Sequence, residues 1–439
     1  NTTASDNTAV GMNALVANTT GGSNTAVGQS ALSGNTTGTR NTALGRTALQ
    51  TNTTGNDNTS AGYFSMYRNT TGQLNTAFGK DALEENTIGS NNVALGYKAL
   101  EANTTASSNT AVGKDALRVN TTGDQNVSVG SSSMDANTTG RNNVAYGMNS
   151  LSGNTTADEN CAIGTNSLFT NTTGTSNTGL GTYSLQNNYT ASNNTGLGYK
   201  ALFANTTGDQ NTGIGANSLQ FNTTGTRNTA VGQGSGYTAT TGVDNSFLGL
   251  AAGYGFGGTN TASYNTALGS YAGFRLTSGA NNTAVGYQAL STNTTGSSNI
   301  AVGGSSLAAN TTGSNNTGLG NAALGANTTG TLNTAVGNGA LDSNTTASNN
   351  TAVGAAALTA NTTGLSNTAV GYTAGSALTT ANQNTFIGVN SGKLITTGAN
   401  NTLIGAYNGN QGGLDIRTSS NNIVLSDGDG NIRFHTNSS

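Results

Sequence analysis

The acidic pair whose spacing best suits chemistry is Glu84 and Glu101, which lie 17 residues apart. Two carboxylates on neighbouring strands can act as the acid and the base of a glycosidase, and their mutual repulsion can raise the pKa of one of them. Asp81, Lys98 and Asp115 repeat with the same 17-residue spacing and alternate in charge. All these charges occupy variable positions, without the aromatic or basic side chains that would hold a sugar. We therefore interpret both sets as solvated surface columns and expect no catalytic residue and no enzyme.

Other residue types that bind metals or cofactors are scarce. The single Cys161 and the single His435 fall short of the three or four nitrogen and sulfur ligands of a zinc site. Asp427 and Asp429 loosely suggest a calcium loop, but the glutamate that completes an EF-hand is missing. A β-turn between short strands at 423–425 and 432–434 is the simpler interpretation. We expect no metal ion and no cofactor.

Composition excludes further function classes. Charged residues make up only 7% of the 439 residues, the net charge is -3, and there is no proline. Fourteen scattered basic residues form no patch for nucleic acid, and no apolar run approaches the roughly 18 residues of a membrane span. We therefore expect neither nucleic-acid binding nor membrane insertion, and a lone cysteine leaves no internal disulfide.

An internal repeat organises the whole chain. The sequence N-T-A-V-G, or a close variant, begins at Asn7 and recurs every 17 residues as far as Asn245. A three-residue insertion between 251 and 265 shifts the next copy to Asn265, and the step then resumes up to Asn401. A copy at Asn422 follows after 21 residues and completes 25 copies. We number the unit N-T-A-V-G-x-x-A-L-x-x-N-T-T-G-x-x from position 1 to position 17.

A 17-residue unit accommodates two short strands and two turns, with the glycines at positions 5 and 15 giving backbone freedom at the corners. Helical repeats need about 30 or more residues. The sequence therefore predicts an all-β fold, a parallel β-solenoid (β-roll) of about 25 coils stacked at about 4.8 Å. We expect one array over 1–407, with irregular coils near 233–264 and 371–400, and a cap or joint over 408–439. Position 9 is glycine instead of leucine in five units, which indicates a second type of coil.

Two columns of large apolar residues, at positions 4 and 9, are predicted to form the core. Position 4 is almost always large and apolar, and position 9 is leucine or methionine over the first half of the array. The core residues predicted on this basis are Val10, Leu15, Val27, Leu32, Leu44, Leu49, Val112 and Leu117.

The asparagine at position 12 begins the commonest motif, N-T-T, which has two interpretations. One is a glycosylation signal, and the other is a ladder of stacked amides that bond from coil to coil. A spacing of about 4.8 Å between coils leaves little room for a glycan on every coil and favours the ladder. The residues concerned include Asn18, Asn35, Asn52, Asn69, Asn103 and Asn120.

Arrays of N-T-A-x-G, A-L and N-T-T-G resemble repeats of bacteriophage tail fibres and bacterial surface proteins. N-T-A-V-G is also similar to the N-S-V-A-I-G motif in the heads of trimeric autotransporter adhesins, whose repeats are shorter. Residues 421–434 look like the segment that precedes an endosialidase-type chaperone domain in phage fibres. The resemblance implies a homotrimer of parallel β-rolls. The thin predicted core argues in the same direction, because sharing apolar columns between chains would offset conformational entropy.

With no chemistry above background, the expected function is structural: the rigid shaft of an extracellular or virion fibre, either a phage tail fibre or a microbial surface filament. Its expected partner is the chain itself, as a homotrimer or joined end to end. The alternative is an adhesin that recognises a cell-surface receptor, a glycan or a protein, through variable positions. Its weak point in the sequence is the lack of clustered aromatic residues beyond a local group such as Tyr63, Phe64 and Tyr67. A depolymerase is the third class, and it would require Glu84 and Glu101.

Overall fold

The computed structural model describes residues 3–437. Asn1, with which the predicted array opens, lies outside the described residues. The chain divides into two compact units, Asn1–Ala216 and Asn217–Ser439. Strands and turns account for the regular structure, and the described residues include no helix and hence none able to cross a membrane. The all-β parallel solenoid of about 25 coils is therefore confirmed.

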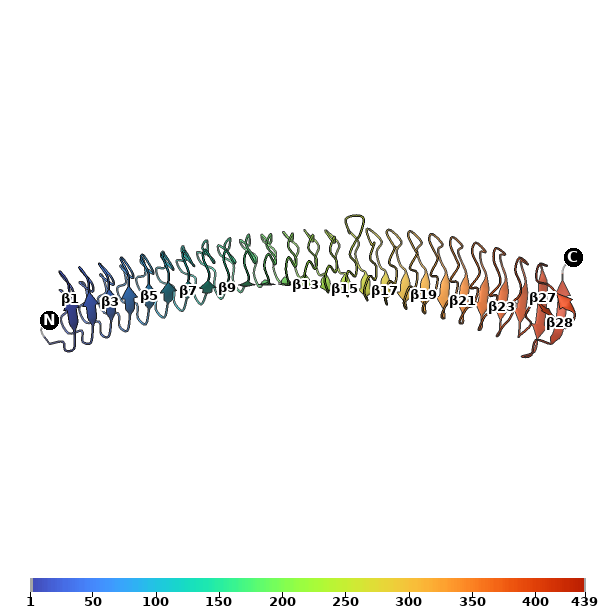
Figure 1. Ribbon diagram of the computed structural model, residues 1–439, viewed down its shortest axis with the longest axis horizontal. Helices are drawn as coiled ribbons and strands as arrows, with labels where there is room; N and C mark the ends of the chain where they lie inside the picture. Colours follow the sequence, from blue (N-terminus) through green and yellow to red (C-terminus); the bar gives the residue numbers. More distant parts are fainter. Residues whose placement is uncertain (1–2, 438–439) are drawn as a thin grey trace. The chain divides into compact units, whose positions relative to one another are not determined.

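The first unit is a stack of coils that each contribute one three-residue strand (Figure 1). Each strand pairs in parallel with its successor 17 residues later, so that Thr8 lies opposite Thr25 and Val10 opposite Val27. The strands are β1 (Thr8–Val10), β2 (Thr25–Val27), β3 (Thr42–Leu44), β4 (Thr59–Ala61), β5 (Thr76–Phe78), β6 (Val93–Leu95), β7 (Thr110–Val112), β8 (Val127–Val129), β9 (Val144–Tyr146), β10 (Cys161–Ile163), β11 (Thr178–Leu180), β12 (Thr195–Leu197) and β13 (Thr212–Ile214).

The second unit repeats this plan and then departs from it. Its parallel strands are β14 (Thr229–Val231), β15 (Ser246–Leu248), β16 (Thr266–Leu268), β17 (Thr283–Val285), β18 (Ile300–Val302), β19 (Thr317–Leu319), β20 (Thr334–Val336), β21 (Thr351–Val353), β22 (Thr368–Val370), β23 (Thr385–Ile387) and β24 (Thr402–Ile404). A small hairpin follows, formed by β25 (Asn410–Gln411) and β26 (Leu414–Asp415). The unit ends with β27 (Asn422–Ser426), parallel to β24, and β28 (Ile432–Asn437), antiparallel to β27.

The core inside each coil is narrower than the sequence predicts. Position 9 points inward as expected: Leu32, Leu49 and Leu117 are fully buried, and Leu15 is 8% exposed. The partners of these leucines are small, because the inward residue of each strand is the one at position 3, usually alanine. Asparagines and small residues at positions 1, 8 and 12 complete the interior.

The prediction that position 4 lies in the core is wrong. Val10 is 57% exposed and Leu44 is 54% exposed, and Val27 and Val112 occupy the same outward position on β2 and β7. Side chains alternate between the two faces of a strand, so in a three-residue strand with a buried centre both ends point out. The sequence argument placed the large residue of each strand, at position 4, inside the coil. In the structure the small residue at position 3 lies inside instead.

The two repeating glycines have different roles. At position 5, Gly113 has φ 137°, a conformation that side chains rarely adopt, and a Cβ would lie 2.5 Å from the Gly130 carbonyl oxygen. At position 15, Gly123 has no such φ, and alanine takes this position at Ala106 and Ala157. The predicted backbone freedom is confirmed at position 5 alone. At position 15 small size is what the stack requires.

Several coils of the second unit have a different interior. Position 9 is glycine in these coils, and in two of them Phe247 and Phe386 stand at position 3 and are buried, whereas the other three have alanine there. A Cβ on Gly253 would lie 2.5 Å from the Phe247 ring, and a Cβ on Gly392 would lie 2.5 Å from the Phe386 ring. The ring therefore occupies the space that leucine fills in the regular coil. This confirms the second type of coil that the glycines indicate.

The three-residue insertion forms a loop between Tyr254 and Asn260. Asn260 forms a parallel bridge with Ala239, so the stack is already back in step there. Gly255 and Phe256 donate their N–H groups to the Phe274 carbonyl oxygen, and Gly258 donates to Gly255. Figure 1 shows this loop standing out near β15 on the side away from the strands.

Candidate functional site

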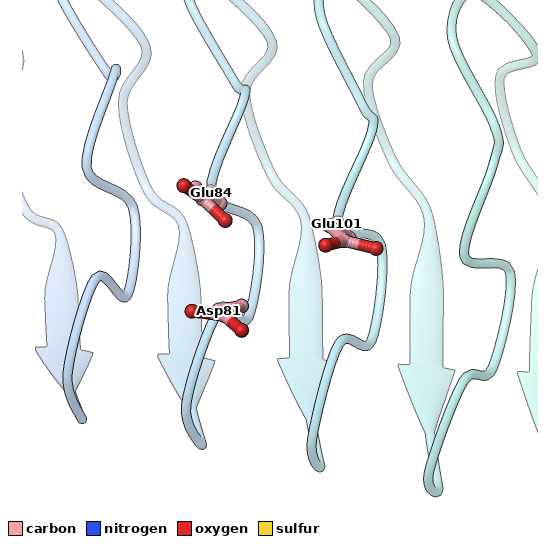
Figure 2. A group of neighbouring side chains, drawn as sticks. All are labelled: Asp81, Glu84 and Glu101. Atoms are coloured by element: carbon pink, nitrogen blue, oxygen red, sulfur yellow. The ribbon is translucent and has the colours of Figure 1, made fainter.

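The structure brings together the acidic residues that the sequence singles out. Asp81 and Glu84 follow β5, and Glu101 lies one coil further on, after β6 (Figure 2). One carboxylate oxygen from each lies within 4.8 Å of the other two. This is the only such group of metal-ligating side chains among residues 3–437. Asp81 is 7% exposed, and the two glutamates are half-buried.

Neighbouring lysines offset much of this negative charge. Lys98 Nζ lies 2.7 Å from a Glu101 carboxylate oxygen, and Lys80 Nζ lies 3.2 Å from Asp81. Glu84 forms no recorded ion pair within the described chain. Burial raises the pKa of Glu84, and the charges of Asp81, Glu85 and Glu101 raise it further. Glu84 is therefore harder to ionise than an exposed, isolated glutamate.

The surroundings of the cluster differ from the expectation of a site without aromatic or basic residues. The Tyr97 ring lies 5.5 Å from Lys80 Nζ and 5.7 Å from Lys98 Nζ. The lysines are nevertheless engaged with carboxylates, and their positive charges offset the negative charge that would attract a calcium ion. Ion pairs within each coil hold Asp81 and Glu101, and Asp81 is buried, which differs from the expected solvated column.

The position-12 asparagines form the predicted ladder in the first unit. Asn35 Nδ2 donates to Asn18 Oδ1 at 2.8 Å and to the Gly38 carbonyl oxygen at 3.0 Å. The same two bonds recur from coil to coil, and the predicted residues Asn18, Asn35, Asn52, Asn69, Asn103 and Asn120 are 0–2% exposed. From Asn35 onward both amide hydrogens are used inside the stack, and the Asn18 amide donates to the Gly21 carbonyl oxygen and is 2% exposed, so these amides are buried in the folded chain.

A second ladder at position 1 was not anticipated. Asn41 N–H donates to Asn24 Oδ1 at 2.9 Å, and Asn24 Nδ2 donates to the Gly38 carbonyl oxygen at 2.9 Å. In the second unit this ladder continues through the insertion, where Asn265 N–H donates to Asn245 Oδ1 at 3.0 Å. The recurrence of asparagine at position 1 was the available signal, because an exposed position would tolerate other polar residues.

The position-12 ladder is interrupted in the second unit. It runs from Asn293 to Asn361, and the residue one coil beyond is the buried Leu378. Asn361 Oδ1 is buried and has no hydrogen-bond partner among the described residues. The ladder therefore ends where the glycine type of coil begins again.

The remaining predicted residues have local structural surroundings. Cys161 is half-buried on β10, and burial raises the pKa of its thiol. His435 Nε2 lies 3.2 Å from Asn422 Oδ1. The Asp427 carboxylate accepts hydrogen bonds from the N–H groups of Asn431 and Asp429, which hold its pKa down at about 2. These bonds close the turn between β27 and β28, as predicted.

Aromatic residues cluster more than the sequence suggests. Tyr63, Phe64 and Tyr67 form the expected group, with ring centroids 4.2 Å and 5.0 Å apart along the series. A larger cluster, in the second unit, was missed. Three of its members share position 10, and the others come from other repeat positions and from the insertion loop. The members are Phe221, Tyr237, Tyr254, Phe256, Tyr271, Phe274 and Tyr287.

Comparisons with known proteins give no relative. No protein-family model matches the chain, and a search of curated proteins finds no significant match. The resemblance to fibre and adhesin repeats thus has no support beyond the motifs themselves. The solenoid and its ladders carry the functional argument.

Proposed function

We propose that this protein is a structural fibre protein whose chains associate side by side, as a homotrimer, to form a rigid shaft. The observation that carries the proposal is the column of outward apolar residues at position 4. A stack with ladder bonds in every coil has the repetitive, neighbour-to-neighbour organisation that suits a shaft.

The position-4 column is continuous within each unit. Val10 and Val27, and then Val27 and Leu44, lie opposite each other on successive parallel strands. In the first unit Phe78 is 46% exposed and Tyr146 is 60% exposed, although coils on either side cover part of each side chain. Large contiguous apolar surfaces on soluble proteins mark interaction sites.

A second copy of the chain is the partner that fits this column best. The column repeats at every coil, and an identical chain offers apolar side chains with the same spacing. The interior of a coil contains one leucine with small and amide side chains, so covering the outer column adds burial that a single chain lacks, at roughly 25 cal/mol per Å². Three chains are proposed because the repeat motifs resemble those of trimeric fibres.

The setting of the fibre is part of the proposal. A virion or extracellular surface suits a proline-free, weakly charged repeat array, and both a phage tail fibre and a microbial filament are consistent with it. End-to-end joining into a filament is an additional form of self-association. We propose no enzymatic activity, since Lys80 and Lys98 pair with two of the three carboxylates of the cluster, those of Asp81 and Glu101. Receptor binding is the alternative function, and the aromatic cluster gives it a location.

The proposal is tested by the mass of the complete chain in sedimentation equilibrium. We expect three times the 43.4 kDa of one chain. In a triple variant, Leu95→Asp, Val112→Asp and Val129→Asp place like charges in register on the outward face, and we expect dissociation with the β-sheet circular dichroism unchanged.

The matched control has the same three charges at position 14 of these coils: Thr105→Asp, Thr122→Asp and Thr139→Asp. These threonines are exposed and lie off the position-4 column, so the control should keep the mass of the parent. A monomeric parent protein would contradict the proposal. Equal dissociation of both variants would show that association does not use the position-4 column.

A further inference from the structure

The position-12 ladder is missing from three consecutive coils of the second unit. Position 12 is occupied there by Ala239, Asn260 and Leu276. Alanine and leucine have no amide to stack. The Asn260 side chain bonds within its own coil, donating to the Gly253 carbonyl oxygen at 3.3 Å and accepting from the Ala262 N–H at 3.0 Å. At this corner the three coils therefore lack the side-chain bonds that join regular coils.

One of these coils is also incompletely filled. In the two coils before it, the Phe247 ring occupies the space beside Gly236 and Gly253. In the coil itself position 3 is Ala267, and a Cβ on Gly273 would meet only the Ala267 Cβ, at 3.6 Å. A void of about 10 Å³ remains beside Gly273. Atoms that line a void lose packing contacts, so this coil is held less firmly from within.

Aromatic rings connect the same coils on the outside of the stack. Tyr237, Tyr254 and Phe274 stand at position 10 of consecutive coils, two residues before position 12. The centroids of Tyr237 and Tyr254 are 4.7 Å apart with the planes 12° from parallel, and those of Tyr254 and Phe274 are 5.3 Å apart at 30°. The ring faces therefore cover one another from coil to coil. Stacked pairs of this kind stabilise beyond the area that they bury.

Further rings extend these contacts to the coils on either side. Phe221 lies 5.1 Å from Tyr237, edge to face. In the other direction, Tyr271 lies 5.4 Å from Phe274 and 6.4 Å from Tyr287, again edge to face. Ring contacts therefore run without a break through five consecutive coils.

The extent of the ring contacts matches the gap in the ladder. They begin in the coil of Asn222 and end in the coil of Asn293, which have the position-12 asparagines on either side of the gap. The insertion loop contributes to them, because its Phe256 ring lies 5.3 Å from Phe274 with the planes 16° from parallel. The rings thus join the coils that the ladder leaves unjoined.

The second gap in the position-12 ladder is built differently. Its position-12 residues are Leu378 and Ile395, and position 10 of the same coils is occupied by Ser376 and Lys393. The Phe386 ring fills the interior of both coils, and the 17-residue spacing is kept. Stacked rings at position 10 thus accompany the gap that contains a void and an insertion, and not the gap that is filled from within.

We propose that the rings form a strap that keeps these coils closed where the ladder is missing, and that separation of the rings opens them as a local unit. Each coil of a solenoid contacts only its neighbours, so one segment can open while the rest of the stack stays folded. The strap consists of Phe221, Tyr237, Tyr254, Phe256, Tyr271, Phe274 and Tyr287. It does not depend on the shaft proposal, because all its contacts lie within one chain.

The test is native-state hydrogen exchange of the complete chain. Tyr254→Gln removes the ring that stacks on two others and introduces the residue type that position 10 has at Gln50. The amides of Thr238 and Gly255 donate to the next coil beside the strap. We expect them to exchange about tenfold faster in this variant, the scale of one or two lost ring pairs. Amides in residues 109–190 should keep their parent rates.

Two controls separate the stack from other effects of the substitution. Tyr254→Phe keeps the ring and loses only the hydroxyl group, so exchange should stay at the parent rates. Phe169→Gln removes a position-10 ring beside an intact ladder, where Asn171 Nδ2 donates to Asn154 Oδ1 at 3.2 Å. Exchange in that coil should therefore change far less than exchange in the strap coils of the Tyr254→Gln variant.

Three results would overturn the strap. One is exchange at parent rates in the Tyr254→Gln variant. Another is equal acceleration in Tyr254→Phe, which would assign the effect to the hydroxyl group. The third is equal acceleration along the whole chain, which would mean that the rings hold no local unit. Failure of the shaft proposal would appear separately, as a monomeric mass in sedimentation.

Discussion

The regular coils of the first unit and the glycine type of coil, found in the second unit, solve the same packing problem with different side chains. In the first unit, a regular coil places leucine at position 9, alanine at position 3 and asparagine at position 12, as with Leu117, Ala111 and Asn120. In the second unit, the coil of Phe386 places glycine at position 9, a phenylalanine at position 3 and an aliphatic residue at position 12, as with Ile395. The coil therefore conserves filled volume and not residue type, as expected of close-packed interiors.

The glycine coil also relieves a backbone constraint. Leu117 has φ 50°, in the left-handed region that large side chains seldom occupy, and Gly392 has φ 62°. The corner keeps its shape in both types of coil, and glycine adopts it without steric cost. The regular coil accepts this cost at position 9 because its leucine is the largest side chain in the interior.

The largest expected effect comes from emptying the glycine type of coil. Phe386→Ala removes a ring that lies between Gly375 and Gly392 and leaves a cavity, so we expect a loss of about 3–5 kcal/mol. Gly392→Leu alone should also destabilise, since a Cβ there would lie 2.5 Å from the ring. Together, the two changes recreate the alanine at position 3 and the leucine at position 9 of a regular coil. The double variant should therefore lose less stability than the sum of the two single losses.

Hydrogen exchange of the amides in β22 to β24 is the suitable measurement, because a stack of repeats need not unfold in one step. The matched control is Leu394→Ala in the same coil, whose side chain is 38% exposed and should matter little. Strictly additive effects in the double variant would show that the ring and the leucine do not occupy the same space.

The next effect compares the middle of the first unit's position-12 ladder with the end of the second unit's ladder. Asn120→Ala removes the partner of the Asn103 Oδ1 atom and of one Asn137 amide hydrogen. Two buried polar groups are then left without partners, and each costs about 1–3 kcal/mol. We therefore expect the local stability of the neighbouring coils, measured by hydrogen exchange, to fall by roughly 3 kcal/mol.

Asn361→Ala is the counterpart at a ladder end. This substitution leaves only the Asn344 Oδ1 atom without its donor. The other atom that it removes, Asn361 Oδ1, already has no hydrogen-bond partner. We expect a loss of roughly 1 kcal/mol, because only one new polar group is left unpaired. Equal losses at Asn120 and Asn361 would contradict the view that the ladder stabilises through its coil-to-coil bonds.

The fold could be predicted from the sequence because a fixed 17-residue step leaves few alternatives. The buried leucines, the position-12 ladder and the second type of coil followed from the same periodicity. The direction of position 4 could not be read in this way, because it depends on the length of each strand. Three residues place the small Ala111 inside and Val112 outside, and only the traced backbone shows where a strand begins.

The candidate sites also divide into one that the periodicity predicts and one that it does not. The acidic cluster was predictable, since Glu84 and Glu101 occupy one column and Asp81 a neighbouring one. The aromatic cluster of the second unit was missed, because only Tyr237 and Tyr254 keep the 17-residue spacing, and the insertion changes the separation of Tyr254 and Phe274 to 20 residues. Phe256 joins the cluster only through the folding of the insertion loop, which the periodicity does not describe.

The smallest effects compare two carboxylates at position 10, Glu84 in the first unit and Asp342 in the second. Burial raises the pKa of both from their usual 4.5 and 3.8, and for Glu84 the charges of Asp81, Glu85 and Glu101 add to the shift. A raised pKa means that the folded state binds the proton more tightly, so stability falls as pH rises from the unfolded pKa through the folded one.

Glu84→Gln and Asp342→Asn should therefore each stabilise the chain at neutral pH, by less than about 1 kcal/mol because neither site is fully buried. The gain should vanish at about pH 3, where both parent acids are protonated. Added salt should reduce the gain for Glu84→Gln, which removes repulsion from its neighbours, and should leave that for Asp342→Asn nearly unchanged, since its shift comes from burial alone. Urea unfolding midpoints at the two pH values, with and without salt, measure the pH effect and the salt effect for each variant. The same salt response in both variants would mean that the clustered charges around Glu84 are already neutralised by Lys80 and Lys98.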